Sequence, residues 1–359
     1  MTQDSDTQIR SYDTFVRKKQ FVFILAVIAT IVVAVFAVSY GSINISVIEV
    51  VKTIFGKGSD MSKTVILGIR LPRVTAAILV GAALAVSGAV MQCVLHNPLA
   101  SASTLGVSQG AAFGAALGII VFGGGVVNSG STNVAIAINN PYIVTLCAFI
   151  FGSLSTIVIL LLSQFKKNLG PGGLILAGVA LSSLFNGGST LLQYFADDTK
   201  ISAVVFWTFG NLGGINWTEL LILAVISAAG MLYFLFNRWN YNAMESGADT
   251  AKSLGVNTRN VMLISMGICS LTAAVAVSFV GIISFVGLVA PHMMRKFVGD
   301  DYRYLIPCSA VSGALLLILA DTFGRFIVAP VVLPVGAITS FLGAPMFLFL
   351  LLKGGKNYG

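Results

Sequence analysis

Long apolar runs separated by short polar segments make up most of this chain. Runs of spanning length lie near 20–40, 73–94, 103–123, 142–162, 173–195, 217–236, 260–280, 282–298, 304–325 and 334–352. An α-helix needs about 20 apolar residues to cross the hydrocarbon core of a bilayer. The pattern therefore predicts an all-α integral membrane protein with about ten transmembrane helices in one domain, residues 1–359. A short extra helix is expected over 201–209.

The first apolar run leaves two interpretations open. It follows Arg17-Lys18-Lys19 and ends near Ala37-Val38-Ser39, which could serve as a signal-peptide cleavage site. Twenty apolar residues are long for the apolar core of a signal peptide. We therefore expect a retained first helix, preceded by a cytoplasmic tail over residues 1–19.

Glycines recur at every fourth position in the third run, at Gly106, Gly110, Gly114 and Gly118. In water each glycine would cost a helix about 1 kcal/mol relative to alanine. In a membrane this spacing places a flat groove on one helix face, where a second helix can approach closely. We expect these four glycines to be helix-packing positions.

Charge supports the membrane interpretation and gives an orientation. Only 9% of the residues are charged, against about 25% in soluble domains. The net charge of +8 is spread between the apolar runs, so no basic stripe suited to nucleic acid is present in the sequence. Two-thirds of the 21 Lys and Arg fall on the side that holds both termini if there are ten spans. The positive-inside rule predicts that this side is cytoplasmic.

Two segments suggest a weak internal repeat. Gly88–Ala100 and Gly281–Arg295 each carry an apolar run that ends in a proline break, at Asn97-Pro98 and at Pro291. They lie five helices apart, so they would insert with opposite topology. Inverted repeats are typical of transporters.

Chemistry-bearing motifs are scarce. No run matches the phosphate-binding G-x-x-x-x-G-K-[ST], so we expect no ATP binding by this chain. Cys93, Cys147, Cys269 and Cys308 are predicted to be buried free thiols, and no metal-site spacing or cofactor motif is found. Asp321 is the only carboxylate well inside a predicted span. Pairing with Arg325 one turn later explains it better than an ion path does.

The longest inner connection, 237–259, contains a segment over 242–256 that could form a short amphipathic helix. Ala243, Ala251 and Leu254 would supply its apolar contacts. The alternative is a solvated loop. Because the other connections are short, we favour contact with a partner.

Two further features have ordinary explanations beside functional ones. The tryptophans of Trp207–Trp217 could form an interfacial belt, whereas the dense glycines between them suggest close packing or a moving gate. His292 could bind a metal or haem. A structural role beside Pro291, where helical hydrogen bonding is interrupted, is the better explanation.

Taken together, these motifs resemble the permease subunits of ABC importers for iron-siderophore complexes, haem and cobalamin (the FecCD/BtuC type, type II importers). The similarity covers about residues 65–353. The matching motifs are Arg70-Leu71-Pro72-Arg73, Gly81–Ala85, Ser87–Gln92, Asn97-Pro98-Leu99-Ala100, Leu105–Gly110, Leu176–Leu181, Trp207–Trp217, Ala251–Val256, Phe285–His292, Ala320-Asp321, Leu333–Gly336 and Gly343–Phe347.

The resemblance implies a homodimer, or a pair with a sister permease, together with two cytoplasmic ATPase subunits and an extracytoplasmic binding protein. The outer arginines Arg70, Arg73 and Arg325 would face carboxylates of the binding protein. ATPase coupling would use Asn242, Ala243, Glu245, Ala251, Leu254 and Gly255. The translocation path or its gate would include Pro171, Gly172, Asn186, Trp207, Gly213, Gly214 and Pro291.

The chain departs from the family pattern at Val332, where an acidic residue often precedes Leu-Pro-Val-Gly. The outer loop 123–141 also looks long. A secondary transporter or channel is the main alternative, and a membrane enzyme is the second. The absence of an acidic relay from the sequence argues against the former, and the lack of a nucleophile–base pair argues against the latter. Among substrates, ferric siderophore comes first, then haem, then cobalamin.

Overall fold

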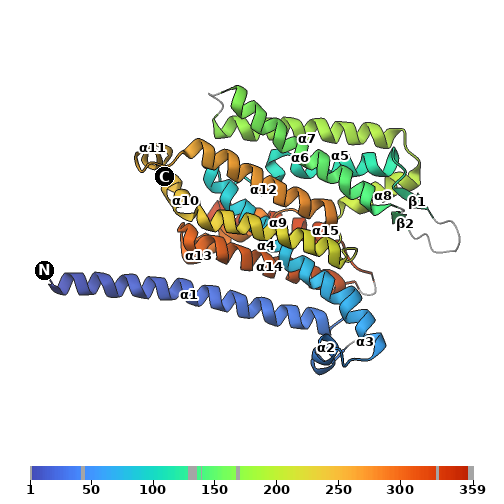
Figure 1. Ribbon diagram of the computed structural model, residues 1–359, viewed down its shortest axis with the longest axis horizontal. Coiled ribbons are helices and arrows are strands. Elements are labelled where there is room, and N and C mark those ends of the chain that lie inside the picture. The colour runs from blue at the N-terminus through green and yellow to red at the C-terminus, as the bar shows by residue number, and fades with distance from the viewer. Residues whose placement is uncertain are drawn as a thin grey trace.

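The computed structural model describes residues 2–41, 45–127, 136–138, 140–166, 170–328 and 331–354. Nearly all of this part of the chain is helical, and the long helices run roughly side by side (Figure 1). The long helices are α1 (Thr2–Ser39), α4 (Leu71–Val94), α5 (Val107–Ile120), α6 (Pro141–Phe165), α7 (Pro171–Tyr194), α9 (Trp217–Phe236), α12 (Thr258–Val280), α13 (Val286–Val298), α14 (Tyr302–Phe326) and α15 (Val335–Gly354). Each corresponds to one predicted apolar run.

Shorter elements join these helices. They are α2 (Val47–Ile54), α3 (Asp60–Val65), a π-helical turn (Ile66–Arg70), a 3-10 turn (Ser103–Leu105), α8 (Asp198–Thr208), α10 (Arg238–Glu245) and α11 (Ala248–Ser253). Within the predicted outer loop 123–141, β1 (Gly125–Val127) and β2 (Ile136–Ile138) pair as an antiparallel ribbon. The tip of that loop, 128–135, lies outside the described residues. The predicted extra helix over 201–209 is α8.

Seven described helices are long and apolar enough to cross a membrane: 16–39, 60–94, 141–165, 171–194, 217–236, 258–280 and 302–326. Two further apolar helices, Val107–Ile120 and Val335–Phe349, are shorter. The predicted run at 103–123 is shortened because Gly106 adopts a left-handed conformation (φ 82°) and separates the 3-10 turn from α5. The run predicted from 282 begins only at Val286, after a non-helical link over 281–285.

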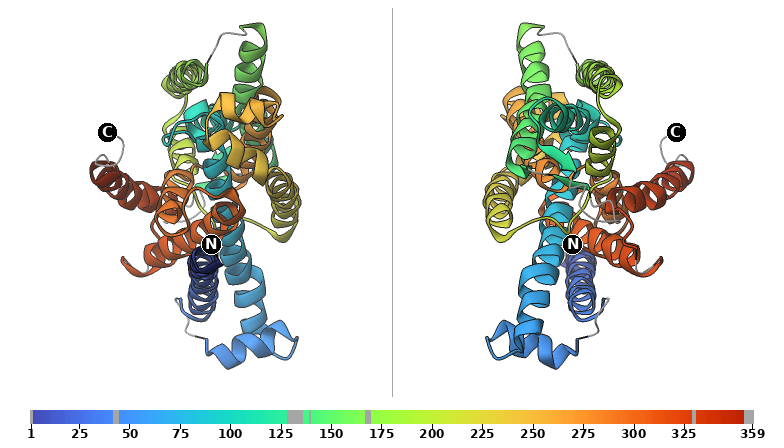
Figure 2. Two further views of the ribbon diagram at one scale, coloured as in Figure 1. Left: turned by 90° about the vertical axis from the view of Figure 1, so that its left-hand side faces the viewer. Right: turned by 90° about the vertical axis from the view of Figure 1, so that its right-hand side faces the viewer.

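Helix α4 lies at the centre of the bundle, where it packs against α14, α12, α13 and α9. Glycines make these contacts possible. A side chain at Gly81 would overlap the Gly313 carbonyl of α14, and one at Gly88 would overlap the Gly287 carbonyl of α13. Figure 2 shows α7 and α15 projecting on one side of the bundle and α9 on the other.

The periodic glycines of α5 face α6. Added side chains at Gly110, Gly114 and Gly118 would meet the backbone of Phe151, Cys147 and Val144 respectively. Gly106 instead lies before the helix, near the Ser155 side chain. The close approach of two apolar helices therefore rests on three positions of the four.

The break expected at Pro291 is corrected by the structure, because α13 runs continuously through that residue. Proline lacks the N–H that would bond the carbonyl four residues earlier, which is that of Gly287. This carbonyl is the one that packs against Gly88 of α4. The irregular backbone lies earlier, at 281–285, whereas Asn97-Pro98 lies in the turn after α4.

Candidate functional site

The predicted coupling segment is two short helices and not one. Gly247, with φ 109°, ends the first and starts the second, because a left-handed residue cannot continue an α-helix. Tyr241 and Met244 are buried and anchor α10 to the bundle. The two helices project at the end of the molecule that also holds the start of α1 (Figure 1).

The residues chosen for this segment face in different directions. Ala251 is fully buried and packs inward, whereas Leu254 is 68% exposed. Glu245 and Gly255 are exposed, and Asn242 and Ala243 are half-buried. Gly255 adopts φ 82°, which lets the chain turn out of α11 toward α12. The surface open to a partner therefore includes Glu245, Leu254 and Gly255.

Asn242 attaches α10 to the start of α14. Its side-chain N–H donates to Asp301 Oδ1 at 3.0 Å, and its side-chain carbonyl accepts from the Tyr302 N–H at 2.7 Å. Burial alone would raise the pKa of the Asp301 carboxyl, but hydrogen bonds from Arg303 and Asn242 outweigh burial and lower that pKa to about 2. Asp301 also caps α14 and lies 3.9 Å from the Lys19 ammonium.

A second set of polar side chains adjoins the bonds of Asn242 and Asp301. The Tyr302 hydroxyl donates toward Glu245 Oε2 at 3.2 Å and accepts from Arg295 Nη2 at 3.0 Å. Arg295 Nη1 donates to Gln92 Oε1 near the end of α4. No role for Arg295, Tyr302 or Gln92 was predicted from the sequence. Polar residues inside or beside apolar runs were the available signal.

At the opposite end, the three predicted docking arginines are bonded within the chain. Arg70 is 6% exposed and donates to the carbonyls of Val38 and Ser39, each at 2.9 Å. Arg73 Nε donates to both Asp321 oxygens, at 2.9 and 3.1 Å. Because α1 and α14 end and α4 begins at this end, the three arginines bond groups of this chain, and their docking to a partner stays a prediction.

Asp321 and Arg325 form the predicted i,i+4 pair, with Nε 3.2 Å from Oδ2. Arg325 also donates to the Ala37 carbonyl at 3.0 Å. Arg70, Arg73 and Arg325 against Asp321 leave a surplus of two positive charges among these four side chains. Val332, which precedes Leu333-Pro334, is 48% exposed and adds no charge.

The predicted path residues are distributed over several elements. Trp207 is half-buried near the end of α8, and Gly213 lies beside the Arg73 guanidinium. Gly214 is open, and Pro291 is buried inside α13. Pro171 begins α7, with Gly172 and Asn186 exposed along that helix. None of these seven residues lines the pocket described below, and their place on the path stays a prediction.

Close backbone contacts do gather near Trp207. A side chain at Gly281 would overlap the Trp207 carbonyl, and one at Gly336 would overlap the Ile282 carbonyl. The Gly336 N–H donates to the Phe209 carbonyl at 3.1 Å, joining the start of α15 to the end of α8. The link 281–285 is therefore held between α8 and α15.

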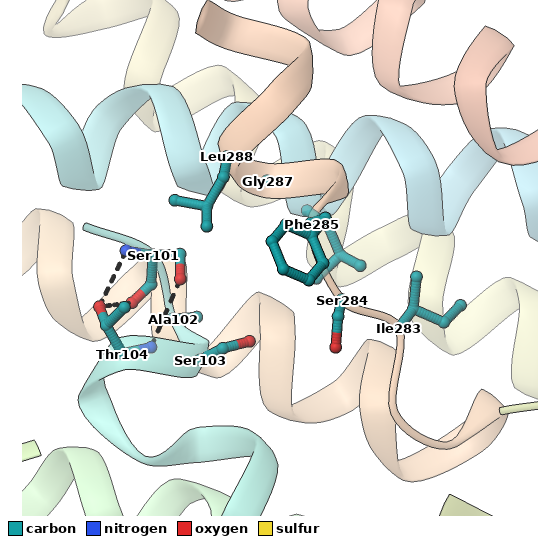
Figure 3. Close-up of a pocket in the computed structure, with 10 residues that line it drawn as sticks. Ser101, Ala102, Ser103, Thr104, Ile283, Ser284, Phe285, Gly287 and Leu288 are labelled. Atoms are coloured by element: carbon teal, nitrogen blue, oxygen red, sulfur yellow. Dashed lines mark hydrogen bonds between the residues drawn. The ribbon is translucent and has the colours of Figure 1, made fainter. Parts of the chain in front are cut away.

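Beside this link lies a pocket of about 260 Å³ (Figure 3). Its walls are the segment 101–104 and the segment 283–288, with Leu84 of α4. Hydroxyl groups of Ser101, Ser103, Thr104 and Ser284 alternate with apolar side chains, and none of the ten lining residues, all described, is charged. Such a lining suits a neutral, hydrogen-bonding surface and not a bare cation.

Phe285, on the wall of the pocket, has φ 65°. A non-glycine residue in this left-handed region costs about 1–3 kcal/mol and persists only where its surroundings enforce it. Gly343 of α15 provides the room, since a side chain there would overlap Phe285 Cβ. The strained residue thus packs directly against α15 at Gly343.

Among the described residues no group of three or more His, Cys, Asp or Glu side chains is arranged to hold a metal. The four cysteines are free, and Cys93, Cys269 and Cys308 are buried. The His292 ring lies 6.4 Å from that of Phe347. These groups offer no evident site for chemistry.

Residues 28–353 match the FecCD transport family. The chain belongs to this family. A Methanocaldococcus jannaschii protein, MJ0087, described as an ABC transporter permease, is 51% identical over 97% of this chain and 99% of its own. The iron(3+)-hydroxamate import permease FhuB of Bacillus subtilis is 36% identical over 88% of this chain and 79% of its own. The hemin transport permease HmuU of Yersinia pestis is 36% identical over 80% of this chain and 83% of its own.

The fold agrees with this membership. A solved structure, described as an inward-facing metal-chelate type ABC transporter, superposes with a TM-score of 0.80 at 30% identity. The match covers 93% of this chain and 99% of that one. This FecCD-family chain is therefore a multi-pass membrane protein of the type II importer permease class, and its relatives are transport permeases.

Proposed function

We propose that this FecCD-family permease carries a metal chelate into the cell, driven by ATP hydrolysis on separate subunits. Ferric siderophore is the first candidate, followed by haem and cobalamin. The observation that carries the proposal is the pair α10–α11, which projects from the spanning helices with Leu254 exposed and Ala251 anchored inside. Outside the spanning helices no lipid covers this side chain, so contact with a soluble partner would remove its apolar surface from water.

The orientation follows from this assignment. The end that holds α10–α11 is cytoplasmic, and both termini of this single transmembrane domain lie on that side. Two permease chains, identical or sister chains, would each contact one ATPase subunit. The side of the bundle where α7 and α15 project would face the second permease (Figure 2).

The cluster of Arg70, Arg73, Arg325 and Asp321 would guide a binding protein to its docking place by charge. Direct ion pairs with that protein would require one condition. Arg73 or Arg325 would have to exchange a bond to Asp321 for one to the partner's carboxylate. The two surplus positive charges would attract an acidic surface before contact and raise the association rate. Docking would thus be sensitive to salt.

The pocket suggests what part of a substrate the chain contacts. Its hydroxyl and apolar lining fits the organic surface of a chelate, and it is too small to enclose one of several hundred cubic ångströms. We place it on the wall of the path, where a passing ligand makes few and weak contacts. Weak contact favours release on the far side.

The decisive experiment is reconstitution of the permease, its ATPase and its binding protein in liposomes. Uptake of labelled ferric siderophore, haem and cobalamin is measured with ATP inside and with proton or sodium gradients alone. We expect uptake of one chelate that requires ATP and the ATPase, and no ATP hydrolysis by the permease alone. Uptake driven by an ion gradient without the ATPase would show a secondary transporter.

A further inference from the structure

Tyr302 occupies an unusual position between the exposed segment α10–α11 and the centre of the bundle. It is the first residue of α14 and is fully buried. Its hydroxyl reaches three groups on three helices: Glu245 Oε2 of α10 at 3.2 Å, Arg295 Nη2 of α13 at 3.0 Å and the Ala89 carbonyl of α4 at 3.4 Å. One oxygen atom therefore connects a surface carboxylate with two interior helices.

Arg295 extends this connection to the inner end of α4. Its Nη1 donates to Gln92 Oε1, and its Nε lies 3.2 Å from Asp300. Gln92 is 3% exposed, two residues before α4 ends at Val94. The chain then turns through 95–100 and forms the pocket wall at 101–104. Partly buried side-chain bonds thus run from Glu245 to Gln92, which lies just before the segment that leads into the pocket.

The hydrogen-bonding capacities in this group do not match, so more than one arrangement is available. A tyrosine hydroxyl has a single proton to donate, yet two acceptors, the Glu245 carboxylate and the Ala89 carbonyl, lie within reach. Hydrogen bonds to a charged acceptor are stronger than those to a neutral one. The Tyr302 hydroxyl therefore donates to the Glu245 carboxylate as long as that carboxylate lies within reach. In addition, Gln92 Nε2 is buried without a hydrogen-bond partner among the described residues.

A change at the surface would therefore alter the interior. Glu245 is exposed, so a partner that binds α10 can attract its carboxylate. The Tyr302 hydroxyl would then rotate and donate its hydrogen bond to the Ala89 carbonyl, and Arg295 and Gln92 would rearrange around it. Such a discrete exchange of partners is the kind of two-state element that carries coupling between distant sites.

We infer that Tyr302 is a positioning residue that links partner binding at α10 to the inner end of α4 and the adjoining segment 95–104, through Glu245, Arg295 and Gln92. The inference rests on the proposed function for its biological meaning. Its physical content, the link between Glu245 and residues 95–104, holds for the permease by itself. Two experiments separate these parts.

The first experiment uses the purified full-length permease in detergent and needs no partner. Hydrogen exchange of peptides covering 95–104 is compared among wild type, Tyr302→Phe and Glu245→Gln. Tyr304→Phe is the matched control, because the described contacts of Tyr304 are made by its ring with Lys19 and Arg303. We expect exchange in 95–104 to accelerate at least threefold in both test variants and to stay unchanged in the control.

The second experiment uses the reconstituted complex. Tyr302→Phe should leave ATP hydrolysis within twofold of wild type and lower the substrate transported per ATP at least fivefold, whereas Tyr304→Phe should change neither. A merely structural role would lower hydrolysis, transport and the melting temperature together, and that result would overturn the inference. Unchanged exchange at 95–104 in Tyr302→Phe would also overturn it, whatever the complex does. Absence of ATP-driven transport by the wild type, with exchange altered as expected, would contradict the proposed function and leave the link itself established.

Discussion

Arg73 of α4 and Asp321 of α14 form a two-pronged ion pair, with Nη2 2.8 Å and Nε 2.9 Å from Oδ1, although 248 positions separate them in the chain. Asp321 has only 2% of its side chain exposed, so it neutralises charge that water cannot reach. It also pairs with Arg325. One buried carboxylate therefore holds two arginines from two helices, at the end of the bundle opposite α10 and α11.

Replacing that carboxylate should be costly. Asp321→Asn leaves Arg73 and Arg325 buried without a counter-charge, and we expect a loss of about 3–5 kcal/mol in unfolding free energy. Thermal unfolding of the purified permease in detergent measures the loss. The control is Asp249→Asn, because Asp249 pairs with Lys252 at 3.1 Å while 99% exposed, and exposed pairs contribute little. Equal melting temperatures for the two variants would contradict this account.

The contact between α4 and α13 should tolerate no side chain at Gly88. In Gly88→Val the new side chain would overlap the Gly287 carbonyl. Overpacking of this kind lowers the free energy of unfolding by about 1–3 kcal/mol or more. A lower melting temperature and loss of the monodisperse peak in size-exclusion chromatography are expected. Gly187→Ala on α7, where nothing lies within 4 Å, should behave as wild type.

Filling the pocket should impair transport more than folding. Ser284→Phe introduces a ring into a space of about 260 Å³ beside Phe285, whereas Ser284→Thr adds one methyl group. In the reconstituted complex we expect chelate uptake to fall at least tenfold for Ser284→Phe and less than twofold for Ser284→Thr. Normal uptake with the ring in place would remove the pocket from the path.

Leu254 should be required for contact with the ATPase. Leu254→Asp puts a charge into an apolar contact, at a cost of several kcal/mol if it is fully desolvated. Co-purification of the ATPase should be lost while insertion in the membrane is unaffected, because the residue lies outside the spanning helices. Leu254→Met should retain binding. If Leu254→Asp still retains the ATPase, the coupling surface lies elsewhere.

Asp301 should make the stability of the junction between α10 and α14 depend on pH. Hydrogen bonds from Arg303 and Asn242 outweigh burial and lower its pKa from 3.8 to about 2. A carboxyl with a lower pKa in the folded state stabilises the fold above its unfolded pKa, and this contribution is lost as the pH falls from about 4 through 2. Melting temperatures from pH 6 to pH 2.5 should therefore fall more steeply for wild type than for Asp301→Asn. Parallel curves of melting temperature against pH for the two proteins would show that the Asp301 carboxylate does not stabilise the folded state.

The pattern of apolar and polar residues along the chain was sufficient to predict most of the helices. Each predicted apolar run corresponds to one long observed helix, because only helices that bond their own backbone groups can cross a bilayer as single segments. The main boundary errors, at Gly106 and at 281–285, occurred where residues adopt φ values of 82° and 65°. A left-handed phenylalanine such as Phe285 carries no sequence signal, since the room for it is left by Gly343 of α15, far along the chain.

Side-chain contacts could likewise be predicted where they are local in sequence, and not where they join distant helices. The pair of Asp321 with Arg325 could be predicted, because residues four apart on a helix are neighbours. That Arg73 joins them, and that Tyr302 meets Glu245 and Arg295, depended on where three or more helices cross. The sequence by itself therefore determined the spans, the family and the helical potential of the segment over 242–256. Only the tertiary structure decided which buried charges meet and that the outer arginines turn inward, because hydrogen-bond partners far apart in the chain are chosen by helix packing.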